Sequence, residues 1–370
     1  MRAGIAGERV TPPLGPGAPD PISGPSRPIP SASGRPLLNP TDVTVRSRVD
    51  VRETIDGDAV FSGIREELVL AGDAPIVVER TRREGRTRAP VVLVHGFAQN
   101  RYTWQLSGRS LVARLADAGY DVWNVELRGH GKSREAGAGN ARNFAEYVDD
   151  LDAVLAAIGE PAFVIGHSLG GGVGVGAATR TPLRGLVHIA GLYAFATRNP
   201  ALRALARASL SAEGTLRAAP VRMSTGWAGR VLARLYKLTD VAGFGLPLAG
   251  WAPGSMEREL LEERLRLGFD WTSVEVWLEM SGWATGVPFP YAEAFRAIEV
   301  PIFVIVGDRD PLLTPADARK IFEDARHPDR TFVEFEPFEY EVHWGHVDLI
   351  LGRRAPDIVW PQIVAWLDAR

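Results

Sequence analysis

Cysteine is missing from this 370-residue chain. Its absence excludes disulfide bonds, thiolate metal sites and a cysteine nucleophile. Long apolar runs are missing too, and none approaches the ~20 residues that would span a bilayer. The N-terminal stretch MRAGIAGERVTPPLGPG lacks the apolar centre of a secretory signal. We therefore expect a cytoplasmic protein with no transmembrane segment.

A strong excess of either charge is also absent. The chain has 42 Lys and Arg against 45 Asp and Glu, a formal net charge of −3. Such a balance gives no long-range attraction to nucleic acid or to an anionic membrane, so we expect no nucleic-acid partner. The hydrophobic share of 45% is that of an ordinary globular protein, and a chain of this size can bury a core without metal or disulfide support.

Residues 1–40 are dense in Pro, Gly and Ser. Such a segment cannot bury enough apolar surface to offset the entropy of ordering it, so we expect a disordered tail. Spacings such as Pro13-Leu-Gly-Pro16 could bind a partner in the polyproline conformation. A solvated tail is the simpler interpretation, and the sequence indicates no protein partner.

From Thr41 onward, strand and helix patterns alternate. Residues 67–79 have the pattern of two strands around a Gly-Asp turn. Residues 91–94 form a continuous apolar run, typical of a strand buried on both faces. Further strands are expected at 120–125, 162–165 and 186–189, and helices at 111–118 and 144–158. The alternation predicts an α/β fold, a mostly parallel central sheet flanked by helices.

The alternation stops over residues 198–297, which have helical and irregular patterns. Strands resume at 301–306 and 331–335, and a helix closes the chain. We therefore expect a core of residues 41–197 and 298–370, interrupted by a helical cap, or lid, at 198–297. An insertion at this place can lie over the carboxyl ends of the strands, where open α/β sheets bind ligands.

The expected cap holds five of the ten tryptophans. Asp270 or Thr272 is the expected N-cap of a helix that carries Trp277. Trp227, Trp251 and Trp277 are candidate contacts for an apolar acyl or aromatic substrate. The alternative is that they belong to the core, which is the usual place of tryptophan in helices.

Residues 164–171, VIGHSLGG, contain the pattern G-x-S-x-G. A serine on a sharp turn between a strand and a helix has a strained backbone, and neighbouring chain comes close on both sides of it. Gly166 and Gly170 leave room for that chain. The following helix points its N-terminal N–H groups at the reacting centre. Because an apolar strand precedes the motif and a small-residue helix follows it, we predict that Ser168 is a nucleophile rather than a structural turn residue.

The segment Val94-His-Gly-Phe97 ends the first parallel strand. In this arrangement one oxyanion donor comes from the loop after that strand and another from the residue after the nucleophile. The candidates are the backbone N–H groups of Phe97 and Leu169. His95 precedes a glycine at a strand end, and we expect it to support the loop rather than to act as a base.

A carboxylate must fix the tautomer of the catalytic histidine, and two carboxylates follow a buried strand. Asp310 lies further beyond the strand end and is favoured as the acid. Asp308 is expected to form the turn, because Asp bonds its own backbone. The base follows the acid in the chain order Ser, Asp or Glu, His. His327 comes before the last strand; of His343 and His346, both after it, we favour His346, which follows a glycine.

Together these residues resemble the α/β-hydrolase family. The resemblance runs from about Pro90 to Leu367 and rests on the segments 95–97 (HGF), 127–133 (LRGHGKS), 166–170 (GHSLG), 307–310 (GDRD) and 345–346 (GH). Residues 120–123 and 346–350 are similar to the acid-lipase and esterase branch. Residues 352–360 are similar to polyhydroxyalkanoate synthases, which use a cysteine nucleophile. Dehalogenases and epoxide hydrolases of the family use an aspartate nucleophile, where this chain has serine. The resemblance gives Arg128 and His130 no direct catalytic part.

The resemblance implies a serine hydrolase that cleaves carboxylic esters through an acyl-enzyme intermediate. The substrate would be a small-molecule ester or acyl compound, and neither a metal nor an organic cofactor would be needed. Three alternatives stay open. They are an acyltransferase, in which an alcohol or thiol replaces water, a serine-dependent C–C bond hydrolase, and a binding protein of the same fold without turnover.

Overall fold

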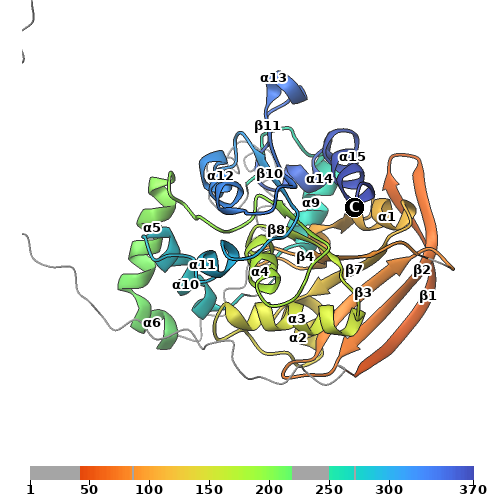
Figure 1. Cartoon of the computed structure of the whole chain (residues 1–370), viewed down its shortest axis with the longest axis horizontal. Coiled ribbons are helices and arrows are strands. Elements are labelled where there is room, and N and C mark those ends of the chain that lie inside the picture. Colours follow the sequence, from red (N-terminus) through yellow and green to blue (C-terminus); the bar gives the residue numbers. More distant parts are fainter. Residues whose placement is uncertain (1–41, 86, 219–249, 271) are drawn as a thin grey trace, which may run out of the picture. The chain divides into compact units, whose positions relative to one another are not determined.

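The computed structural model describes residues 42–85, 87–218, 250–270 and 272–370. These residues form an eleven-stranded sheet in which neighbouring strands follow the order β11-β10-β9-β8-β4-β7-β3-β2-β1-β6-β5. The strands are β1 (Val43–Asp56), β2 (Ala59–Leu70), β3 (Ile76–Arg82), β4 (Pro90–Val94), β5 (Gln105–Leu106), β6 (Arg109–Ser110), β7 (Asp121–Glu126), β8 (Phe163–His167), β9 (Gly185–Ile189), β10 (Ile302–Gly307) and β11 (Arg330–Phe335). The expected α/β fold is confirmed (Figure 1).

The strands from β11 to β7 in this order are all parallel to their neighbours. Every residue of β4, β7, β8, β9 and β10 is buried. Helices cover both faces of such a sheet, so its strands have apolar runs instead of alternation. The carboxyl ends of parallel strands meet at one edge. This edge brings together the loops after β4, β8 and β10, which carry candidate site residues.

An antiparallel part continues the sheet from β7. The hairpin expected within residues 67–79 is confirmed, because β2 pairs with β3 and Leu70 lies opposite Ile76. Strand β1 was not expected from the sequence. It pairs with β2 across a turn at Gly57, and most of its residues are exposed. Its valines alternate with polar residues as in a half-buried strand, but Val43, Val45 and Val49 are exposed, so the alternation does not mark a buried face.

Helices flank the sheet and also pack against one another in pairs. Helix α1 contacts α15, and α3 contacts α4 (Figure 1). Between β1 and β9 the helices are η1 (Arg101–Thr103), α1 (Leu111–Asp117), α2 (Gly131–Glu135), α3 (Ala145–Ile158) and α4 (Leu169–Ala178). After β10 they are α12 (Pro315–Asp324), α13 (Pro337–Tyr340), α14 (Asp348–Leu351) and α15 (Ala355–Asp368).

Helix α4 packs closely on the sheet because half of its ten residues are glycine. A Cβ on Gly170 would collide with the backbone of Val94, and one on Gly174 would lie 2.8 Å from Leu186 Cδ1. A Cβ on Gly176 would lie 2.5 Å from Val148 Cγ2. The small residues therefore bring the helix close to β4 and β9, at a cost in helix propensity.

The region expected as a cap contains α5 (Pro200–Ser211), α6 (Glu213–Ala218), α9 (Arg258–Leu267), α10 (Val274–Ala284) and α11 (Ala292–Phe295). Helix α5 packs along α10. The N-cap of α10 is Ser273, whose hydroxyl accepts from Val276 N–H. The expected caps, Asp270 and Thr272, were therefore wrong. The expected tail at residues 1–40 lies outside the described residues, and so does much of the segment between α6 and α9.

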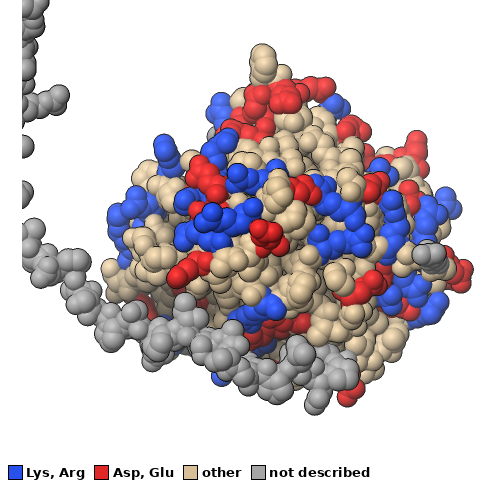
Figure 2. Space-filling model, viewed as in Figure 1, with Lys and Arg blue, Asp and Glu red and all other residues tan. Residues whose placement is uncertain are grey.

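Within the described residues, no helix combines the length and apolarity needed to cross a membrane. Lysine, arginine, aspartate and glutamate side chains are interspersed over the face shown in Figure 2. This mixture agrees with the near balance of charges in the sequence.

Candidate active site

Ser168 lies between the last residue of β8 and the first residue of α4. Its backbone has φ 55° and ψ −122°, a conformation that side-chain-bearing residues rarely adopt. Two backbone bonds hold the turn: Ser168 N–H donates to Ile189 O at 3.1 Å, and Leu192 N–H donates to Ser168 O at 2.8 Å. A Cβ on Gly166 would collide with Gly170 O. Both glycines of the motif are thus required by a close approach of backbone.

The loop after β4 lies beside this turn. A Cβ on Gly96 would lie 3.0 Å from Ser168 Cβ, so only glycine lets the loop approach the serine. Phe97 follows and is half-buried, and Leu169 begins α4. The first N–H groups of a helix have no partner within the helix. Ala98 has φ 55°, and its carbonyl accepts from Asp270 N–H at 2.9 Å, which connects this loop to the segment after α9.

His346 and Asp310 form a buried pair. His346 Nδ1 lies 2.7 Å from Asp310 Oδ2, and the two side chains are 2% and 0% exposed. The other carboxylate oxygen, Oδ1, accepts the backbone N–H groups of Leu312 and Leu313 at 2.8 and 2.9 Å. These bonds fix the carboxylate, and the carboxylate fixes the imidazole. His346 Nε2 has no hydrogen-bond partner among the described residues, which leaves it able to accept a proton.

Asp308 does not form the turn that we expected but connects two loops. Its Oδ2 lies 2.5 Å from Nδ1 of the half-exposed His343, and its Oδ1 accepts Trp344 N–H at 2.9 Å. It therefore joins the loop after β10 to the loop that carries His346. The local backbone bonds that we assigned to Asp308 belong to Asp310.

Sequence reasoning missed His167, the residue before the candidate nucleophile. Its Nε2–H donates to the backbone carbonyl of His346 at 3.0 Å, and the two rings lie 4.5 Å apart. Burial, and to a smaller extent the neighbouring imidazole of His346, lowers the pKa of His167 well below its usual value. A neutral, buried imidazole thus binds the loop that carries His346. Its place directly before Ser168 was the only signal in the sequence.

His95 supports the loop after β4, as expected. It is fully buried, its Nδ1–H donates to Gly96 O at 2.9 Å, and Leu127 N–H donates to its Nε2 at 3.2 Å. Burial lowers the pKa of His95 well below its usual value, so the ring is neutral. With both nitrogens engaged, it is not available as a base. Arg128 also has a structural partner, because its guanidinium donates to the buried Asp150 at 2.6 and 2.8 Å.

The three candidate tryptophans differ in position. Trp277 on α10 is half-buried, and its ring centroid lies 5.9 Å from that of Phe97. Trp251 is 2% exposed and packs behind the loop of His346, where its Cα approaches Gly345. It belongs to the core, the alternative left open for these tryptophans, and not to a substrate-lining surface. Trp227 lies outside the described residues.

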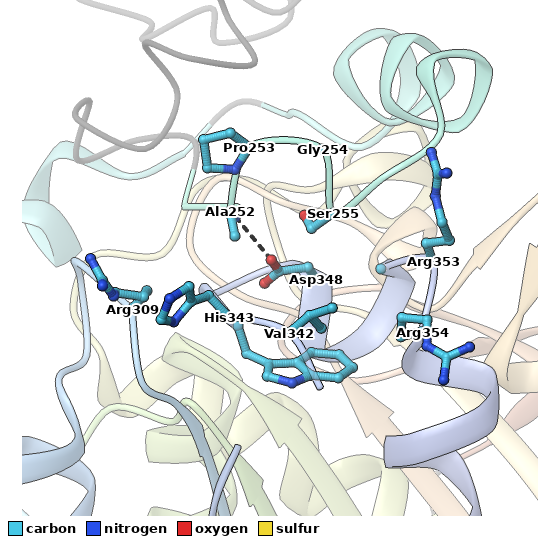
Figure 3. A pocket seen from close by; sticks show the side chains of 12 residues that line it. Ala252, Pro253, Gly254, Ser255, Arg309, Val342, His343, Asp348, Arg353 and Arg354 are labelled. Atoms are coloured by element: carbon cyan, nitrogen blue, oxygen red, sulfur yellow. Dashed lines mark hydrogen bonds between the residues drawn. The ribbon is translucent and has the colours of Figure 1, made fainter. Parts of the chain in front are cut away.

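A hollow of about 510 Å³ is lined in part by the loop that carries His346 and by segment 252–255 (Figure 3). His343 and Trp344 line it from that loop, and the buried Asp348 is among the other lining residues. Asp348 accepts the N–H groups of Ala252 and Gly345 at 2.9 and 2.7 Å. Burial raises the pKa of Asp348 to about 6. This carboxylate joins segment 250–255 to the loop that carries His346.

Comparisons with known proteins identify the family of the chain. A family model described as the alpha/beta hydrolase family matches residues 91–358. The chain is 41% identical over 81 residues to epoxide hydrolase B of Mycobacterium tuberculosis, which covers 22% of each protein. It is 24% identical over 331 residues to lipase member K of Mus musculus, which covers 77% of this chain and 81% of the lipase. The matches span about a fifth to a third of the length of the first curated relatives.

Solved structures also resemble the chain. A monoacylglycerol lipase of Paleococcus ferrophilus aligns with a TM-score of 0.54 at 23% identity, covering 79% of this chain and 98% of the lipase. A monoglyceride lipase of Saccharomyces cerevisiae, solved with a substrate analogue, aligns with a TM-score of 0.59 at 18% identity, covering 81% and 93%. At these identities the similarity shows the fold.

Proposed function

Because the chain belongs to the alpha/beta hydrolase family, we propose that it is a serine hydrolase that cleaves carboxylic esters. Ser168 is the nucleophile, His346 the general base and Asp310 the acid that orients it. The observation that carries the proposal is the buried 2.7 Å pair of His346 and Asp310. His346 lies in a loop that is bonded to His167, and His167 directly precedes the strained Ser168 in the sequence.

The reaction follows from the donors and acceptors of these groups. Asp310 accepts from His346 Nδ1–H, so Nε2 takes the proton of Ser168 while Oγ attacks the ester carbonyl. The backbone N–H groups of Phe97 and Leu169 donate to the oxyanion that forms. His346 then gives the proton to the leaving alcohol, and water releases the acyl group by the same steps. The bond from Nε2 to the serine is commonly long in a free enzyme and shortens when substrate binds.

A small-molecule ester with an apolar acyl chain is the substrate class that we propose. The contact of Trp277 with Phe97 supports it, because it places an aromatic side chain beside the proposed oxyanion hole. Lipase member K and the monoacylglycerol lipases among the similar proteins support an ester as well. We further propose that residues 198–297 form the cap, residues 41–197 and 298–370 the core and residues 1–40 a disordered tail. Neither a metal nor an organic cofactor takes part in these steps.

The test combines a probe with substrates. A fluorophosphonate should label the wild-type protein at Ser168, and p-nitrophenyl esters of increasing acyl length should be hydrolysed. Ser168→Ala should lose the label and lower kcat by on the order of 10⁶, leaving the catalysis of the oxyanion hole and of binding. Ser168→Ala protein that keeps most of its esterase activity would contradict the proposal. Products formed in the presence of excess alcohol distinguish a hydrolase from an acyltransferase.

A further inference from the structure

Arg264 on α9 is a buried cation without an anionic partner. The residue is 2% exposed, and no carboxylate of the described residues lies within ion-pair distance of its guanidinium. Its Nη2 has no hydrogen-bond partner there, and Nη1 has a long bond of 3.5 Å to Thr103 Oγ1. Burial lowers the pKa of Arg264 to about 10, so the side chain stays charged at neutral pH.

Arg109 shows how this chain otherwise buries an arginine. It is 4% exposed, and its guanidinium donates to Asp56 at 2.7 Å and to Glu257 at 2.7 and 2.9 Å. A buried charge without such partners is unfavourable for folding. The ring of Phe269, whose centroid lies 5.9 Å from Arg264 Cζ, compensates only part of this cost, so fold stability alone does not explain Arg264.

The surroundings of Arg264 connect it to the candidate active site. Thr103 Oγ1 donates to Gln99 Oε1 at 2.8 Å. Gln99 belongs to the loop after β4, which carries the proposed oxyanion donor Phe97. Its Nε2 lies 3.1 Å from the point that a Cβ on Gly96 would occupy. The same point lies 3.0 Å from Ser168 Cβ. The amide of Gln99 and the candidate nucleophile thus flank Gly96.

Hydrogen-bond polarity fixes the orientation of this amide. A guanidinium only donates, so Thr103 accepts from Arg264. The threonine hydroxyl has a single hydrogen, which it then donates to the amide. The amide atom that receives it must be the oxygen, and the NH₂ group lies on the other side. The oxygen of Thr103 has a second lone pair, but an NH₂ donor on it would face the positive charge of Arg264. If Arg264 were absent, this repulsion would be lost, and the flipped amide would turn its oxygen toward Ser168.

We propose that Arg264 is a positioning residue that acts through Thr103 to keep the N–H groups of Gln99 facing the reacting centre beside Ser168. The inference rests on the proposed function, to which it adds a donor on the side of the oxyanion. Negative charge develops there in the transition state, and fixed N–H dipoles stabilise it better than a carbonyl oxygen would. The cation is therefore retained for catalysis rather than for folding.

The test measures kcat, KM and melting temperature with p-nitrophenyl butyrate. Arg264→Met should lower kcat roughly 10- to 100-fold with little change in KM, a part of what loss of an oxyanion donor costs. It should also leave the melting temperature unchanged or higher, because an unpaired buried charge is removed. Arg264→Lys keeps a charged donor and should restore part of kcat. Arg109→Met is the matched control and should lower the melting temperature with kcat unchanged.

A double-mutant cycle identifies the route. Gln99→Leu removes the amide, so adding Arg264→Met to it should cause no further loss of kcat. Additive losses would overturn the route through Gln99, and an unchanged kcat in Arg264→Met would overturn the inference. So would a lowered melting temperature with no rescue by lysine, since that pattern marks a structural residue. These results leave the proposed function standing if the wild type hydrolyses the ester and Ser168→Ala does not. A wild type without turnover would overturn both.

Discussion

Replacing Asp310 by Asn exchanges one carboxylate oxygen for an amide nitrogen and tests the proposed triad with almost no change in volume. In the wild type, Oδ1 accepts two backbone N–H groups and Oδ2 accepts His346 Nδ1–H. The new side chain has only one acceptor oxygen. That oxygen is needed where the two backbone donors converge, so the NH₂ group must face the histidine.

An NH₂ group facing His346 forces Nδ1 to accept, and the ring proton moves to Nε2. The imidazole then cannot take the serine proton in this tautomer. Loss of the correct tautomer costs about 10⁴ in kcat in a Ser-His-Asp triad. At 1.36 kcal/mol for each factor of ten, this is about 5 kcal/mol of transition-state stabilisation. Because the backbone bonds are kept, we expect the fold to remain intact.

The assay compares initial rates on p-nitrophenyl butyrate for Asp310→Asn and Asp308→Asn, with circular dichroism to verify folding. Asp308→Asn is the matched control, because its carboxylate contacts the half-exposed His343. Such a pair contributes about 1 kcal/mol or less to stability, and kcat should change little. If Asp308→Asn lost activity while Asp310→Asn kept it within about tenfold of the wild type, the assignment of the acid would be refuted.

Three further predictions follow from the structure and the sequence. Gly170→Ala should abolish activity and destabilise the fold, since its Cβ would collide with the backbone of Val94; a normal melting temperature and kcat would contradict the packing of α4. Trp277→Ala should change kcat/KM unequally for acetyl and octanoyl esters, because each buried CH₂ contributes about 0.8 kcal/mol, whereas Trp251→Ala in the core should mainly lower the melting temperature. Equal losses for both esters in Trp277→Ala would remove it from the substrate site. A chain beginning at Thr41 should keep the melting temperature and kcat/KM of the full chain, and a clear drop in either would show that residues 1–40 pack on the core.

The parallel strands could be predicted from the sequence because buried strands consist mainly of apolar residues. Strand β4 is apolar throughout, β8 and β9 are apolar except for one buried histidine each, and Gly or Ser follows each strand closely in the sequence. Strand β1 was not predicted because most of its residues are exposed to solvent on both faces. Its valines alternate with arginines and other polar residues, but this alternation does not mark a buried face. The turn residues Asp56 and Gly57 were the available signal for that hairpin.

Individual partners were harder to predict than elements. Asp308 and Asp310 have the same chemistry and lie two residues apart, and only the three-dimensional structure shows which histidine each one contacts. Arg264 has the spacing of an ordinary charged residue on an amphipathic helix. Its burial depends on the loop around Gln99 and on Thr103, more than 150 residues earlier in the chain. A local sequence pattern cannot predict contacts between residues so far apart in the chain.

The glycine-rich helix α4 has a consequence for how the enzyme forms. Each glycine costs about 1 kcal/mol of helix propensity relative to alanine, so this segment has little tendency to become helical by itself. It gains its structure only by docking on strands that lie far apart in the sequence. The backbone of Ser168 acquires its strained geometry in the same event. A folding intermediate with most of its secondary structure but no packed α4 would thus be inactive, and the recovery of esterase activity on refolding would report the docking of this helix rather than the formation of the sheet.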